Sequence, residues 1–109
     1  MRVIKTDHFS RQLKSCTKKY RNISADVALS LNAFNKMSAA YLGAKLYKVR
    51  VKSSDMKKGK SGAFRVIVLC VEINNMLIPV TIYQKSVQEK ITERELEYHL
   101  ARIREELNT

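Results

Sequence analysis

Residues 46–52 read Leu-Tyr-Lys-Val-Arg-Val-Lys. Apolar and cationic side chains alternate here with period two, which is the pattern of a β-strand with one face in a core. The pattern predicts that Tyr47 and the two valines share the apolar face, while Lys48, Arg50 and Lys52 share the other. Burying several unpaired charges would cost many kcal/mol. The cationic face is therefore expected to meet water or an anion.

Two more strands are predicted downstream of this segment. Phe64–Ile73 is rich in β-branched residues, which favour strands, and Leu77–Tyr83 follows a turn signal at Asn74-Asn75. Pro79 cannot donate a hydrogen bond to a ladder, so it is expected near the start of its strand or at a bulge. Together with residues 46–52, these segments predict a three-stranded antiparallel meander.

Helical patterns lie on both sides of the predicted sheet. After a short strand at Val3–Lys5, Asp7 is expected to cap a helix from about His8 to Tyr20, and a second helix follows Ser24. Downstream, residues 92–95 read Thr-Glu-Arg-Glu, the Thr-x-x-Glu form of a capping box. The helix predicted after this box carries an apolar stripe at Leu96, Leu100, Ile103 and Leu107.

The order of these elements decides the fold class. A meander needs its apolar face covered, and helices before and after it supply that cover. The sequence therefore predicts an α+β fold in one domain over residues 1–109. An antiparallel sheet is packed by an N-terminal helical hairpin and by a C-terminal helix.

The net charge of the chain points to a polyanionic partner. The 109 residues carry 21 Lys and Arg against 10 Asp and Glu, a formal charge of +11, and the cations concentrate before residue 66. Such a balance favours RNA, DNA or an acidic protein. Cys16 and Cys70 are isolated, with neither a disulfide framework nor metal-type spacing, so a reduced, cytoplasmic protein without metal or cofactor is expected. The longest apolar run, Val66–Val71, is too short to cross a membrane.

The cationic side chains extend beyond the first strand. Arg65 opens the central strand, and antiparallel pairing is expected to return Lys85, at the end of the next strand, toward it. Gly59-Lys60-Ser61-Gly62 lacks the spacing of a nucleotide-binding P-loop. Phosphate contacts are expected from the strand and the polar loop after it, at Lys52, Lys57, Lys58 and Lys60. Two tyrosines flank this segment and are either base-stacking or core-edge residues, Tyr47 and Tyr83.

Four segments carry a resemblance to a known family: Tyr47–Val51, Gly59–Ile67, Thr81–Ser86 and Ile91–Glu95. In this order they resemble the RelE/ParE superfamily of toxins from type II toxin–antitoxin systems, and most closely its RelE/HigB-like branch. The resemblance implies a RelE-like microbial-RNase fold. It also implies an mRNA interferase, a metal-independent endoribonuclease that cuts mRNA on the ribosome. The implied partners are a cognate antitoxin protein, the ribosome and mRNA.

The resemblance also implies which residues act on the scissile phosphate. Carried over by motif, they are Lys48, Arg50, Arg65 and Lys85, which would stabilise charge as the ribose 2′-OH attacks. The family often has arginine where this chain has Lys85. Its stacking tyrosine has no counterpart in residues 87–91, which leaves Tyr83 as the substitute candidate.

Two other functions are compatible with the same residues. One is a ParE-like inhibitor of DNA gyrase, and the other is a non-catalytic module that binds RNA or the ribosome. His8 and His99 are expected to lie away from the basic patch, which disfavours a histidine acid–base pair. Lys48 or Lys52 is then the candidate base, and no residue is assigned as the general acid.

Overall fold

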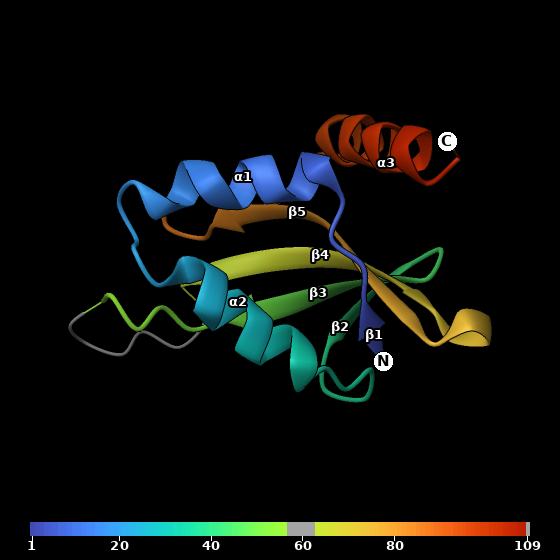
Figure 1. Ribbon diagram of the computed structural model, residues 1–109, viewed down its shortest axis with the longest axis horizontal. Coiled ribbons are helices and arrows are strands. Elements are labelled where there is room, and N and C mark those ends of the chain that lie inside the picture. Colours follow the sequence, from blue (N-terminus) through green and yellow to red (C-terminus); the bar gives the residue numbers. More distant parts are fainter. Residues whose placement is uncertain (57–62, 109) are drawn as a thin grey trace.

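The computed structural model describes residues 1–56 and 63–108 and shows an α+β fold (Figure 1). The predicted fold class is confirmed. The elements follow in the order β1 (Arg2–Val3), α1 (Asp7–Thr17), α2 (Ile23–Asn32), β2 (Ala40–Gly43), β3 (Leu46–Val51), β4 (Phe64–Val71), the 3-10 helix η1 (Glu72–Asn74), β5 (Met76–Gln84) and α3 (Glu93–Leu107).

The sheet has five strands in the order β1-β5-β4-β3-β2. The meander of β3, β4 and β5 is antiparallel, as predicted. The prediction of an antiparallel sheet is wrong for one pair of strands, however, because β1 pairs with β5 in parallel. The sequence pattern also missed β2, which pairs antiparallel with β3; its side chains are largely exposed, so its sequence lacks a buried, period-two face.

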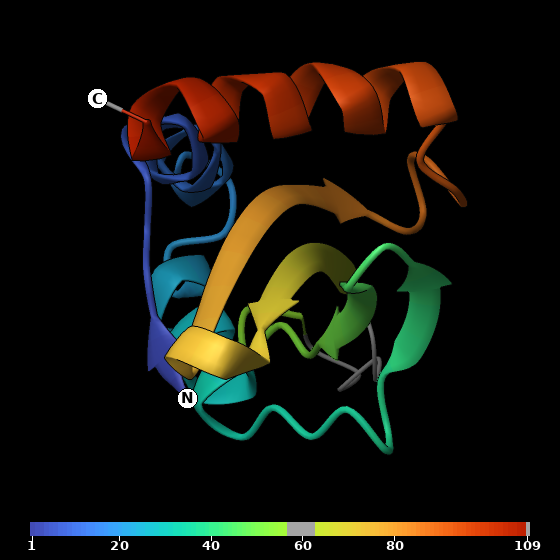
Figure 2. The same ribbon diagram turned by 90° about the vertical axis from the view of Figure 1, so that its right-hand side faces the viewer.

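Helices cover the two faces of the sheet, as Figures 1 and 2 show. The α1–α2 hairpin packs on one face, where Phe9 and Ile23 are fully buried against strand residues such as Val51. On the other face, α3 lies beside β5 and buries Ile103. Leu100 is only half-buried and Leu107 is exposed, so the predicted apolar stripe of α3 makes a shallow contact.

The helix starts show which caps the sequence identified correctly. The Thr92/Glu95 capping box of α3 is present as predicted. The prediction of Asp7 as the cap of α1 is wrong, because the Thr6 hydroxyl accepts the Phe9 N–H at 3.2 Å and Asp7 lies inside the first turn. There its carboxylate still faces the positive end of the helix.

Pro79 lies at a bulge in β5, one of the two predicted placements. Ile67 pairs with Thr81 and Val68 pairs with Pro79, which leaves Val80 as an extra residue on β5. A bulge accommodates a residue that cannot donate a ladder hydrogen bond. Proline therefore fits into a long inner strand at this point.

Candidate active site

The ladder between β3 and β4 places two arginines opposite each other. Arg50 pairs with Arg65, and Lys48 pairs with Ile67, so all three basic side chains leave the same face of the sheet. The Cys70 N–H donates to the Lys45 carbonyl at 2.9 Å, which fixes the alternation of hydrogen bonds along this ladder. By that alternation the two arginines form a non-hydrogen-bonded pair, the type in which Cα atoms approach to about 4.5 Å.

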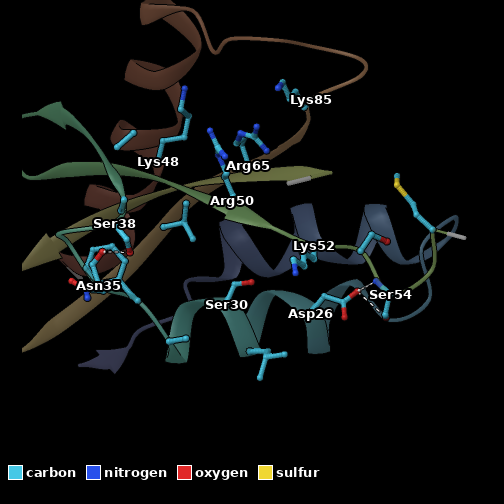
Figure 3. A pocket seen from close by; sticks show the side chains of 18 of the residues that line it. Asp26, Ser30, Asn35, Ser38, Lys48, Arg50, Lys52, Ser54, Arg65 and Lys85 are labelled. Atoms are coloured by element: carbon cyan, nitrogen blue, oxygen red, sulfur yellow. Dashed lines mark hydrogen bonds between the residues drawn. The ribbon is translucent and has the colours of Figure 1, made fainter. Parts of the chain in front are cut away.

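Lys85 reaches the same place from the end of β5. Its backbone N–H donates to the Ala63 carbonyl at 3.1 Å, two residues before Arg65. Figure 3 shows the Lys85, Arg65, Arg50 and Lys48 side chains on one side of β3. The structure therefore brings together the four residues that the sequence predicts to act on a phosphate.

These side chains line a groove of about 1140 Å³. It runs along β3, with the sheet on one side and α2 together with residues 33–40 on the other. Asp26 and Glu89 are the acidic residues on the described lining, and the Asp26 carboxylate accepts bonds from the Ser54 N–H at 2.9 Å and hydroxyl at 3.0 Å. Cations therefore dominate the described lining, at Lys48, Arg50, Lys52, Arg65, Lys85 and Lys90.

Arg65 differs from the other cations because it is buried. The residue is 6% exposed, whereas Arg50, opposite it, is exposed. The Arg65 Nη1 donates to the Phe64 carbonyl at 3.3 Å. A guanidinium held in this way is oriented before a ligand arrives, which is the requirement for stabilising charge that develops on a phosphoryl oxygen.

The two tyrosines do not present rings to the groove. Tyr47 lies on the opposite face of β3 from Lys48, in contact with the ring of Phe34 at a centroid distance of 5.6 Å. Tyr83 is 9% exposed and belongs to the core under α3, where burial raises the pKa of its hydroxyl against the opposing effect of Arg65. These positions match the core-edge alternative. Base stacking by Tyr83 stays a prediction, and the low exposure of this residue leaves little of it open to a base.

The predicted RNA-binding lysines divide into two groups. Lys52 lines the groove. The other three predicted contacts, Lys57, Lys58 and Lys60, lie outside the described residues.

The second wall of the groove was not predicted from the sequence. Ser30, Asn35 and Ser38 line it, and they come from α2 and from the segment before β2, where no pattern pointed to a site. Lys90 also lines the groove and was not predicted from the sequence.

The two histidines lie outside the groove lining, as expected, but they contact each other. His8 Nε2 and His99 Nδ1 are 2.7 Å apart and join α1 to α3. Burial is the main cause that lowers the pKa of both rings. Beside them, the Glu106 carboxylate of α3 accepts the backbone N–H groups of Asp7 at 2.6 Å and His8 at 2.9 Å, and the His8 bond lowers its pKa. This polar cluster ties α3 to the start of α1.

Comparison with known families identifies the chain. The family model described as the RelE toxin of the RelE/RelB toxin–antitoxin system matches residues 1–107. No curated protein matches the sequence significantly. In the described part of the chain, no helix has the length and apolar character needed to span a membrane. Because the family model covers almost the whole chain, this protein belongs to the RelE family of toxins from toxin–antitoxin systems.

Proposed function

We propose that this protein is the toxin of a type II toxin–antitoxin system and cleaves mRNA on the ribosome in the cytoplasm. The observation that carries the proposal is the buried guanidinium of Arg65 within a row of basic side chains. A surface that only attracts phosphates needs exposed cations alone. Stabilising the charge of a transition state requires, in addition, a cation that is already held in a fixed orientation.

The chemistry uses the ribose of the message as nucleophile. The 2′-oxygen attacks the adjacent phosphorus, a new 2′-O–P bond forms and the bond from phosphorus to the 5′-oxygen breaks. The products are a 2′,3′-cyclic phosphate and a 5′-hydroxyl end. One proton leaves the 2′-OH for a base, and one proton reaches the departing 5′-oxygen.

The groove residues divide these tasks by position. The side chains of Arg65 and Arg50 project from the same face of the sheet. They are suited to bind the non-bridging phosphate oxygens, since a guanidinium group can donate two parallel hydrogen bonds to a phosphate. Lys85 follows the end of β5 and is hydrogen-bonded through its backbone to Ala63, just before β4 begins. From there its ammonium group is suited to stabilise the charge on the leaving oxygen. Lys48 or Lys52 is the proposed base, because both are groove-lining amines beside this pair.

Cleavage on programmed ribosomes tests the proposal. Purified protein is added to ribosomes stalled on a defined message, and primer extension maps the new 5′ ends. We expect breaks in the codon at the ribosomal A site and none when the same message is incubated without ribosomes. An intact message together with inhibited supercoiling by DNA gyrase would favour the ParE-like alternative. Binding to ribosomes with neither effect would favour the non-catalytic module.

A further inference from the structure

The hydroxyl group of Tyr83 is a buried polar group that packing alone does not explain. Tyr83 is 9% exposed, and its Oη atom has no hydrogen-bond partner among the described residues. A buried hydroxyl without a partner destabilises a fold, and such atoms are uncommon in folded proteins. Phenylalanine would fill the same space in the core under α3 without that cost. Packing therefore accounts for the ring of Tyr83 but not for its hydroxyl.

The strand register places Tyr83 in one row with two arginines. Tyr83 pairs with Arg65 across β5 and β4, and Arg65 pairs with Arg50 across β4 and β3. Side chains directly opposite each other on neighbouring strands project from the same face, with Cβ atoms about 4.5–5.5 Å apart. Arg50 is exposed, whereas Arg65 and Tyr83 are both buried. Tyr83 is therefore the inner neighbour of the Arg65 guanidinium, which lines the groove.

The chemistry of this neighbour makes the Tyr83 hydroxyl a donor that needs an anion. A guanidinium carries N–H donors only, so Arg65 cannot accept the hydroxyl proton. Burial raises the pKa of the Tyr83 hydroxyl, and the charge of Arg65 acts in the opposite direction, so the field of the guanidinium reaches this group. Because its pKa is raised, the hydroxyl keeps its proton at neutral pH. A neutral donor beside a cation is an arrangement suited to an oxyanion.

We propose that the Tyr83 hydroxyl is a further hydrogen-bond donor of the site, which donates to the phosphoryl oxygen bound by Arg65. This inference rests on the proposed function, because it places a phosphodiester oxygen at the Arg65 guanidinium. Arg65 lines the groove although it is 6% exposed, so an oxygen that reaches it arrives at the inner end of the groove, next to Tyr83. A neutral donor there stabilises the oxygen without adding to the repulsion between the two arginines.

The hydroxyl is then expected to act on stability and on binding in opposite directions. In the protein alone, its missing hydrogen bond destabilises the fold. With an anion bound at Arg65, the same hydroxyl gains an acceptor. Tyr83→Phe should therefore unfold at a higher urea concentration than wild type in a buffer without phosphate or sulfate, and it should bind a phosphodiester more weakly. A tyrosine with a purely structural role gives no such loss of affinity.

Tyr83→Phe and Tyr41→Phe test this difference. Each removes one hydroxyl, and Tyr41 is the matched control because it is 62% exposed on β2 and does not line the groove. The probe is a deoxytrinucleotide of thymidine, which has phosphodiesters but no 2′-OH and so cannot be cleaved. By calorimetry, we expect Tyr83→Phe to bind it about tenfold more weakly than Tyr41→Phe does. Equal affinities, or a urea midpoint of Tyr83→Phe at or below that of wild type, would overturn the proposal.

A cycle of variants with Arg65 tests whether the two groups act on the same oxygen. The loss of affinity caused by Tyr83→Phe should be about tenfold when Arg65 is present and at most about twofold in the Arg65→Ala background. A tenfold loss in both backgrounds would show that the hydroxyl acts elsewhere and would contradict the proposal.

Ribosomal cleavage is measured separately, so that the two proposals can fail independently. Under single-turnover conditions, we expect Tyr83→Phe to cut mRNA at least about tenfold more slowly than Tyr41→Phe. If wild type does not cut mRNA on ribosomes, the proposed function fails, while the trinucleotide still decides whether Tyr83 is a donor to phosphodiesters. If wild type cuts and Tyr83→Phe cuts at the same rate, the role of the hydroxyl at the reacting phosphate is wrong.

Discussion

Removing the Arg65 guanidinium is expected to abolish cleavage without unfolding the protein. Arg65 lies on the inner strand β4, is 6% exposed and donates to the Phe64 carbonyl. Losing one oriented donor in a comparable anion site lowers the rate by about 10²–10³, or roughly 2.7–4 kcal/mol of transition-state stabilisation. The Phe64 carbonyl keeps its ladder bond from the Val51 N–H, so losing the Arg65 donor costs only about 0.5–1.5 kcal/mol of stability, and removal of the like charge opposite Arg50 partly offsets that cost.

The assay is single-turnover cleavage on programmed ribosomes with Arg65→Ala, Arg65→Lys and wild type. Lysine keeps the charge but loses the planar fork, so Arg65→Lys should retain part of the rate. Arg21→Ala is the matched control, because Arg21 is exposed and does not line the groove. Melting curves identify any variant that unfolds. A folded Arg65→Ala that cuts within about threefold of wild type would refute the role assigned to Arg65, because the expected loss is at least about 10².

Three other outcomes follow from the structure. Affinity for ribosomes should fall with salt at a log–log slope near −0.7 per neutralised single-strand phosphate, and a flat dependence would contradict phosphate contact. Ile103→Ala should cost about 2–5 kcal/mol by urea unfolding, and Leu100→Ala about 1 kcal/mol, because Ile103 is 1% exposed and Leu100 is half-buried. Burial lowers the pKa of His8 and His99, so the folded state binds fewer protons than the unfolded state and stability should fall as pH drops below about 6.5. In the His8→Gln/His99→Gln double variant, the urea midpoint should no longer fall as pH drops through this range. If it falls as steeply as in wild type, other groups cause the pH dependence.

The predictable parts of the fold are those that a local pattern encodes. The capping box at Thr92 and the alternation of residues 46–52 are short-range signals, and both elements formed as expected. β2 has no such signal, because it is an edge strand held by pairing with β3 and most of its side chains meet solvent. The parallel pairing of β1 with β5 joins residues far apart in sequence, and no two-residue segment can encode it.

The candidate site was predictable to the extent that strand register was. Alternation put Lys48 and Arg50 on one face, and a meander then returned Lys85 toward Arg65. The burial of Tyr83 was not predictable, since it depends on where α3 crosses the sheet. The contact of His8 with His99 depends on the same crossing, which brings the two ends of the chain together.

The arrangement of the groove favours an anionic occupant. Arg50 and Arg65 are directly opposite on one face, and like charges in that position destabilise a sheet. Lys48 and Lys85 add to the repulsion, and the burial of Arg65 reduces the screening by water. An anion bound at this pair of arginines is therefore favoured electrostatically. A message phosphate bound there would meet both guanidinium groups, which agrees with the charge stabilisation proposed for Arg65.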